Sequence, residues 1–184
     1  MIGYLPKTLN VNGKALPIRT DFRIVLNLFP MYEDQELSDP EKAYITCKRL
    51  YDCEIAPEDF IEATKQAYWY IDGGEMPKSE PSKARIIDWQ KDERMIMPAV
   101  SKTIGVPDIR ALSYLHWWTF LGCFGEIGEG MMTTVLTLRR KQAEGKLTKE
   151  ERDFVRKNED LICLRTPEEE AELQELRDFL DTIT

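Results

Sequence analysis

Hydrophobic and polar residues alternate through residues 9–16, on both sides of the dipeptide Asn12-Gly13. An Asn-Gly pair between alternating residues is the strongest short-range signal of a two-residue hairpin turn, because both turn positions need left-handed backbone angles. The pattern therefore predicts a small β-hairpin within residues 5–19.

After the hairpin, hydrophobic residues recur at helical spacing, and local signals mark where helices start and stop. Thr20 or Asp21 can cap a helix that stops at Pro30. Pro40 and Pro57 stand at likely first helical positions. Helices are predicted near residues 20–30, 40–52, 57–71, 84–104, 112–124, 131–140, 148–162 and 166–184. The expected fold class is mainly α, a helical bundle with a small N-terminal β-hairpin.

Two further signals concern helix ends in the C-terminal half. Pro98 is expected to kink or end the helix over residues 84–104, because proline lacks the N–H group that a helix interior needs. Thr148 and Glu151 have the spacing of a capping box, in which each side chain accepts a hydrogen bond from the backbone of the other. A helix is therefore expected to begin after Thr148.

Residues 73–83 contain two glycines and two prolines among polar residues and continue neither helical nor strand periodicity. We interpret them as a linker. The chain then divides into an N-terminal hairpin with helices at 1–72, a helical body with the Trp-Trp helix at 84–165, and an acidic C-terminal helix at 166–184.

The segment 112–124 holds the only histidine and two of the four tryptophans. As a helix it is apolar on every face, which indicates burial at the centre of a helical fold or at a partner interface. Adjacent residues on a helix point about 100° apart, so Trp117 and Trp118 are both buried only if the helix is surrounded or one ring meets a partner. Core packing is the favoured interpretation, and an interface stays open.

The last predicted helix combines an apolar stripe with an acidic surface. Its apolar residues follow the 3-4-3 spacing of a coiled coil: Leu173, Leu176, Leu180 and Ile183. The stripe covers less than two heptads, so packing onto its own domain is at least as well supported as a homo-oligomer. Seven acidic residues against one arginine follow residue 167, and acid near a helix N-terminus suits the helix dipole.

Composition and charge narrow the function classes. The length of 184 residues suits one domain, or one domain plus a small appendage. The net charge of −8 and the pI near 4.9 oppose binding to nucleic acid or anionic membranes. Residues 139–165 carry nine basic against six acidic residues, an excess that fits a solvated helix face. No apolar run reaches the roughly 18 residues that span a bilayer, and we expect a cytoplasmic protein.

The sequence offers little support for catalysis, a metal or a cofactor. The four cysteines are scattered without a CxxC pair, and we expect reduced, buried thiols and no zinc site. His116 has no nucleophile at motif spacing, so a buried, hydrogen-bonded histidine is favoured over a catalytic base. The glycines of residues 122–130 do not follow a strand, and Glu126 and Glu129 there would repel phosphate. The same two glutamates are a weak candidate for an acid and base pair.

Several segments in order resemble one family of tailed-phage proteins. They are residues 87–89 (IDW), 106–109 (VPDI), 115–120 (LHWWTF), 135–139 (VLTLR), 146–152 (KLTKEER) and 156–158 (RKN). The family is labelled bacteriophage gene product fifteen, and its members look like tail assembly chaperones. The resemblance covers roughly residues 1–165, and the acidic C-terminal helix lies outside it.

The resemblance implies a non-enzymatic assembly factor in the cytoplasm of the bacterial host. It would hold the long, helical tape-measure protein soluble while tail-tube subunits polymerise, with the tail-tube protein as a second expected partner and no cofactor. The alternative is a structural tail or head-completion component that remains in the virion. Exposed apolar stripes on helices promote association, and an apolar groove can cover them.

Candidate partner-binding residues follow from the apolar segments, since binding energy concentrates in large aromatic and aliphatic anchors. The first group is Trp117, Trp118, Phe120 and Leu121. The second is Leu173, Leu176, Leu180 and Ile183.

Overall fold

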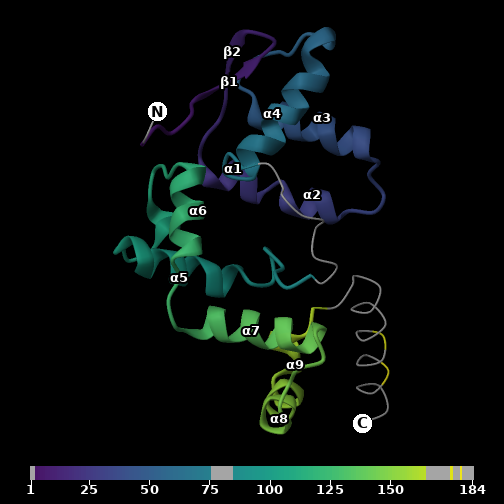
Figure 1. Ribbon diagram of the computed structural model, residues 1–184, viewed down its shortest axis with the longest axis vertical. Helices are drawn as coiled ribbons and strands as arrows, with labels where there is room; N and C mark the ends of the chain where they lie inside the picture. Colours follow the sequence, from purple (N-terminus) through teal and green to yellow (C-terminus); the bar gives the residue numbers. More distant parts are fainter. Residues whose placement is uncertain (1–2, 76–84, 165–174, 176–178, 180–184) are drawn as a thin grey trace. The chain divides into compact units, whose positions relative to one another are not determined.

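The computed structural model describes residues 3–75, 85–164, 175 and 179 (Figure 1). These residues are mainly helical with a two-stranded antiparallel hairpin near the N-terminus, which confirms the expected fold class. The strands are β1 (Thr8–Val11) and β2 (Lys14–Pro17). The helices are α1 (Phe22–Leu26), α2 (Phe29–Glu33), α3 (Asp39–Leu50), α4 (Phe60–Ile71), α5 (Glu93–Ile104), α6 (Trp117–Gly125), α7 (Met131–Ala143), α8 (Lys149–Lys157) and α9 (Glu159–Ile162). The 3-10 turns are η1 (Pro57–Asp59) and η2 (Ile109–Ala111).

The chain forms two compact units. Unit 1 comprises Met1–Pro81 and Trp89–Gly130, and unit 2 comprises Ser82–Asp88 and Met131–Thr184. Most of the predicted linker at 73–83 lies outside the described residues, so the division of the chain around it stays a prediction. No helix among the described residues is long and apolar enough to cross a membrane.

The hairpin forms at the predicted turn and lies against α4 (Figure 1). Val11 pairs with Lys14, and Asn12 and Gly13 adopt φ angles of 50° and 84°, as this turn requires. Asn12 and Lys14 both donate to the buried carboxylate of Asp59, over 2.9 Å and 2.7 Å. These hydrogen bonds, led by that from Lys14, lower the pKa of Asp59 and fix the turn to the start of α4.

The helix predicted over residues 20–30 is in fact two short helices. Asp21 caps α1 by accepting a hydrogen bond from the backbone N–H of Arg23, as predicted. The predicted stop at Pro30 is wrong, because α1 ends at Leu26 and Pro30 lies in the first turn of α2. Proline is tolerated there because first-turn N–H groups have no intrahelical partner.

The helix predicted over residues 84–104 is shorter and passes through its proline. It begins only at Glu93, and the described residues before it form an irregular segment and a turn. Pro98 lies inside α5 without ending it, so of the two predicted outcomes the end is wrong and the kink stays a prediction. Proline in a helix interior removes the bond to the carbonyl four residues earlier, here that of Arg94, and the remaining bonds of α5 continue the helix. The helix ends at Gly105, whose φ of 82° forms a left-handed cap.

The core of unit 1 is a stack of aromatic rings around α6. The Phe120 ring stacks on those of Phe22 and Trp117, with centroids 5.0 Å and 5.5 Å apart. The Phe29 ring stacks on Trp89 at 4.7 Å. The Phe29 ring also lies 6.1 Å from that of Trp117, so these rings connect α1, α2, α6 and the segment before α5.

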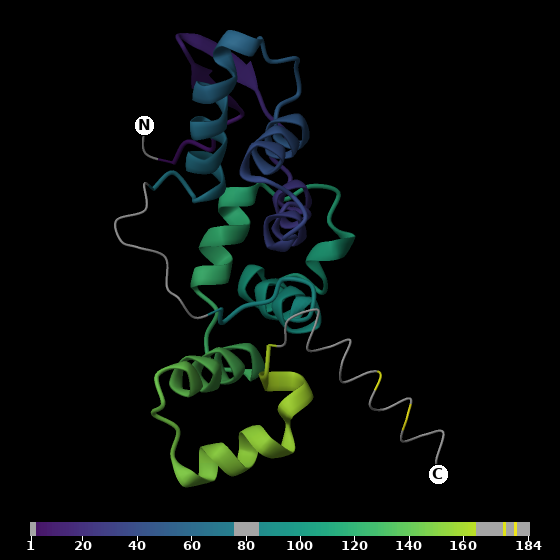
Figure 2. The same ribbon diagram turned by 90° about the vertical axis from the view of Figure 1, so that its right-hand side faces the viewer.

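In unit 2, α7, α8 and α9 surround a small core of Leu138, Val155 and Ile162 (Figure 2). The predicted capping box of Thr148 and Glu151 starts α8 with both reciprocal hydrogen bonds. The capping box fixes the start of α8, and the apolar contacts pack α7, α8 and α9 together.

Candidate partner-binding surface

The predicted tryptophan helix begins at a histidine cap. The Nδ1 atom of His116 accepts a hydrogen bond from the backbone N–H of Trp118 over 3.0 Å, so the ring proton is on Nε2. Nε2 then donates to the carbonyl of Pro6, also over 3.0 Å. His116 is 3% exposed, and this burial lowers the pKa of its imidazole. It is therefore a buried, hydrogen-bonded residue, as the sequence predicted.

The two tryptophans bind the C-terminal end of α4. The indole N–H of Trp117 donates to the carbonyl of Ile71, and that of Trp118 donates to the carbonyl of Tyr70, each over 2.8 Å. The Tyr70 carbonyl also accepts from the backbone N–H of Gly73 over 3.2 Å. The last carbonyls of a helix lack intrahelical partners, so Trp117 supplies Ile71 with a donor from outside α4. Both tryptophans thus have a structural function in unit 1.

Two glycines make room for this arrangement. Gly73 and Gly74 follow α4 with φ angles of 75° and 87°, which favour glycine. A Cβ atom at Gly74 would lie 2.8 Å from Cη2 of Trp118, and one at Gly73 would lie 3.3 Å from Cδ1 of Leu121. The side chains of Trp118 and Leu121 therefore pack directly on this backbone.

The predicted partner-binding residues separate into three groups. Trp117 and Phe120 are 1% and 0% exposed, so they belong to the core and leave no surface for a partner to contact. Trp118 and Leu121 are half-buried, and a partner-binding role for their remaining surface stays a prediction. The second predicted group, Leu173, Leu176, Leu180 and Ile183, lies outside the described residues.

A groove on unit 1 offers a binding surface that sequence reasoning did not identify. Its volume is about 470 Å³, within the usual range of binding pockets. It lies between α1, the start of α2, the first half of α5 with the residues before it, and η2. Its lining residues are Phe22, Arg23, Leu26, Asn27, Pro30, Trp89, Gln90, Glu93, Met97 and Arg110.

The apolar side chains of the groove are held in place by packing against the core. Leu26 of α1 and Trp89 before α5 are half-buried and expose apolar surface to the groove, whereas Phe22 and Met97 are buried and support its floor from the core. Trp89 is held by its stack on Phe29 in the aromatic core. A preformed apolar surface of this kind binds with little loss of conformational freedom.

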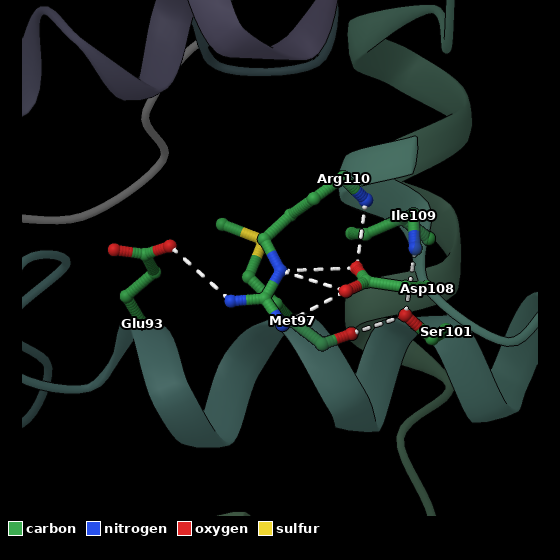
Figure 3. A network of polar contacts seen from close by, with 6 residues as sticks. All are labelled: Glu93, Met97, Ser101, Asp108, Ile109 and Arg110. Carbon is green, nitrogen blue, oxygen red and sulfur yellow. Dashed lines mark hydrogen bonds and ion pairs between the residues drawn. The ribbon is translucent and has the colours of Figure 1, made fainter. Parts of the chain in front are cut away.

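Charged side chains border the groove. Arg110 forms a two-pronged pair with Asp108, in which its Nε lies 3.0 Å from both carboxylate oxygens and its Nη2 lies 2.8 Å from Oδ2 (Figure 3). These hydrogen bonds hold the pKa of Asp108 below its usual value. On its other side, Nη1 of Arg110 lies 3.8 Å from Glu93. Asp108 therefore holds Arg110 closely, whereas the ion pair with Glu93 is long.

The turn that carries Arg110 is fixed to α5 by one buried side chain. Ser101 Oγ donates to the Met97 carbonyl over 2.7 Å and accepts from the Ile109 N–H over 2.9 Å (Figure 3). Arg23, from α1, lies over the Phe22 ring and donates to the carbonyl of Leu112. Both arginines are thus held by the folded backbone around them.

The groove combines residues whose positions in the sequence gave no sign of a shared surface. Residues 22–30, 89–97 and 110 come together only in the fold. The sequence did offer one signal, Trp89, which is a large aromatic residue between the polar residues Asp88 and Gln90. Polar neighbours on both sides are unusual for a residue in the core.

A second pocket, lined by Cys47, Cys53 and Glu54 among others, has a volume of about 170 Å³, which is below the usual size of binding pockets. All four cysteines are free; Cys47 is buried, while Cys53, Cys123 and Cys163 are half-buried and thus more accessible than expected. Within the described ranges, no group of three or more His, Cys, Asp or Glu side chains is placed to hold a metal ion. The groove is therefore the surface we consider for function.

Comparison with known proteins shows to which family the chain belongs. No curated protein and no solved structure matches it. A family model described as Bacteriophage Gp15 protein matches residues 1–164 of the 184. The match covers the hairpin, the tryptophan helix, the groove residues and all three helices of unit 2. The chain therefore belongs to the bacteriophage Gp15 protein family.

Proposed function

We propose that this phage protein is a non-enzymatic tail assembly chaperone, which binds the tape-measure protein and keeps it soluble while the tail tube assembles. The observation that carries the proposal is the preformed groove on unit 1, with apolar residues from α1 and α5 and a charged border. Family membership supports a phage role, and the groove suits the binding of another polypeptide. The protein would act in the cytoplasm of the bacterial host without a cofactor.

The physical basis is the exposure of apolar helix surface on the partner. A long helical protein that waits for its tube presents apolar stripes to water, and such stripes associate with one another. A groove that accepts the apolar side chains of one helix face competes with that association. The tail-tube protein is a second proposed partner, because the tube forms around the same segment.

The test is co-expression with the long, helix-rich product of the adjacent gene. Wild-type chain should keep that product in the soluble fraction and co-purify with it. Leu26→Asp places a charge in the groove and should abolish both effects. Ile61→Asp, at a residue that is 72% exposed on α4 and outside the groove, is the matched control and should retain both. Circular dichroism would verify that each variant is folded.

Purified particles distinguish this function from the alternative of a structural tail or head-completion component. A chaperone should be absent from virions or far below stoichiometric amounts in quantitative mass spectrometry. Stoichiometric recovery from virions, together with no effect on the solubility of the long product, would replace our proposal with the structural role.

A further inference from the structure

We propose that Cys53 and Cys47 form a thiol pair that peroxides oxidise to a disulfide, with Cys53 oxidised first and Cys47 as the second thiol. The pair is a modification site on unit 1, and the class of reagent it takes is small peroxides, represented by hydrogen peroxide. This inference is independent of the proposed function, because it needs neither the groove nor a partner protein.

Both thiols line the same small pocket. It lies between the end of α3, the segment that follows this helix and the start of α4. Its lining residues are Tyr44, Cys47, Lys48, Cys53, Glu54, Ile55 and Phe60. Its volume of about 170 Å³ is small for an organic ligand but several times the roughly 30 Å³ that one water molecule takes in the liquid. The pocket therefore suits a reagent of a few atoms, such as hydrogen peroxide.

Two further observations place the cysteines close together. Nζ of Lys48 lies 3.1 Å and 3.0 Å from the two carboxylate oxygens of Glu54, so the residues that follow the two cysteines are in direct contact. Burial raises the pKa of the Tyr51 hydroxyl, and the charges of the Cys47 and Cys53 thiolates raise it further, so both sulfurs lie near one hydroxyl group. The open volume leaves room for the Cys53 side chain to turn towards Cys47, as an S–S bond of about 2.05 Å requires.

The two thiols differ in accessibility, which sets the order of reaction. Cys53 is half-buried, whereas Cys47 is 2% exposed. The Thr64 hydroxyl donates to the Phe60 carbonyl over 2.9 Å, so in its 3.5 Å contact with Cys47 the thiol is the donor. Burial raises the pKa of the Cys47 thiol and favours its protonated form. Because the nucleophile is a thiolate with access to the reagent, Cys53 reacts first.

The charges at the pocket do not activate either sulfur. The ionic side chains among the lining residues are Lys48 and Glu54, and they pair with each other, so their charges cancel. Cys53 therefore reacts with peroxide as an ordinary accessible thiol, and the neighbouring Cys47 decides the product. A sulfenic acid beside a second thiol condenses to a disulfide, whereas an isolated one is oxidised on to sulfinic acid.

The reaction balances with the peroxide as oxidant. The Cys53 sulfur, after losing its proton, attacks one oxygen of hydrogen peroxide. The O–O bond breaks, Cys53 becomes a sulfenic acid, and the released hydroxide takes up the proton to form water. The Cys47 sulfur then attacks the Cys53 sulfur as the S–O bond breaks, and the leaving hydroxide combines with the Cys47 proton to form a second water. The two thiols lose two electrons in all, and the peroxide gains them.

The test is peptide mapping of the reduced full chain after brief exposure to hydrogen peroxide. Remaining thiols are blocked with N-ethylmaleimide, and the chain is digested with trypsin, which cleaves after Lys48 and Arg49, between the two cysteines. Mass spectrometry should find residues 43–48 joined to residues 50–65 by a disulfide that dithiothreitol separates again. Oxidation of Cys53 to sulfinic acid without this linked pair would overturn the inference.

Substitutions test the order of reaction. Cys53→Ser should leave Cys47 reduced, because the buried sulfur is shielded from peroxide in the folded chain. Cys47→Ser should leave a sulfenic acid at Cys53, which dimedone labels and which further peroxide converts to sulfinic acid. Cys123→Ser removes a half-buried thiol that does not line the pocket, and this matched control should form the linked pair as wild type does. Oxidation of Cys47 in Cys53→Ser at the wild-type rate would contradict the proposal.

The wild-type chain alone also tests two alternative sources of a disulfide. Covalent dimers through Cys53 on a non-reducing gel, without the linked pair inside one chain, would overturn the inference. Circular dichroism of the treated chain should show an unchanged helical signal. A linked pair that appears only together with loss of this signal would come from unfolded chain and would likewise refute the proposal.

Discussion

The indole ring of Trp118 occupies the space that a side chain at Gly74 would need. A Cβ atom there would lie 2.8 Å from Cη2 and 3.0 Å from Cζ2 of this ring. The same indole donates to the Tyr70 carbonyl, four residues before Gly74. The end of α4 and the start of α6 therefore pack together because the Trp118 ring fills the space that glycine at position 74 leaves open.

This relationship predicts the effect of Gly74→Ala. The variant should lose about 1–3 kcal/mol more free energy of unfolding than a glycine replacement without a clash, because overpacking adds to backbone strain. Gly105→Ala supplies that control, since Gly105 has a similar φ of 82° and open space around it. It should cost about 1–2 kcal/mol. Urea unfolding measures both, and equal losses would mean that the Trp118 ring moves aside freely.

Signals contained within a few adjacent residues were interpreted correctly from the sequence. The Asn12-Gly13 turn and the Thr148–Glu151 capping box each depend on atoms at most three residues apart, and both formed as predicted. Pro30 was misinterpreted because proline both ends one helix and starts another. Only the observed end of α1 at Leu26 decides between the two interpretations.

The surroundings of α6 could not be predicted, because they come from distant parts of the chain. Trp117 and Trp118 bind carbonyls 46 and 48 positions earlier in the sequence. Hydrophobic spacing showed that the helix is apolar all round, but not which neighbours cover it. The groove was missed for the same reason, since Arg110 meets α1 and α5 only in three dimensions.

The histidine cap of α6 predicts a loss of stability in mild acid. The pKa of His116 is lowered in the folded chain, first by burial and then by the charge of Lys7, so the unfolded chain binds a proton more readily. Stability is therefore complete above the unfolded pKa of 6.5 and declines as the pH falls towards the lower folded pKa.

The check is to compare wild type with His116→Asn in urea unfolding between about pH 7.5 and pH 5. Asparagine is a good N-cap acceptor and does not titrate in this range. The difference in unfolding free energy should shift in favour of the variant as the pH falls. A constant difference across the range would show that His116 does not contribute to the pH dependence.

The burial of Phe120 predicts that this residue affects stability rather than partner contact. Phe120→Leu removes ring stacking with Phe22 and Trp117 and should cost about 1–2 kcal/mol in urea unfolding. The folded fraction should bind partners as wild type does, since the Phe120 side chain is 0% exposed. Leu121→Ala, at the half-buried neighbour, is the variant with which the partner binding of Phe120→Leu is compared. Weaker partner binding by fully folded Phe120→Leu would return this position to the interface.

The buried guanidinium of Arg139 predicts that one residue holds unit 2 together. Its Nε and Nη2 atoms donate to the carbonyls of Ile162 and Leu161 at the end of α9, over 2.6 Å and 2.9 Å. Its Nη1 atom donates to Ile86 over 3.1 Å, so three carbonyls from two separate segments share one side chain. Helix-end carbonyls lack intrahelical partners, and burial makes the loss of a donor costly.

Arg139→Met keeps the length and apolar stem of the side chain but removes the donors. It should lower the free energy of unfolding of unit 2 by about 2–4 kcal/mol. Amide hydrogen exchange should accelerate in α9 and around residue 86 and stay unchanged in the aromatic core of unit 1. Arg140→Met, at the exposed neighbour, should have little effect on either region. Unaltered exchange in α9 of the Arg139 variant would mean that the apolar contacts of Leu138, Val155 and Ile162 suffice to hold this helix.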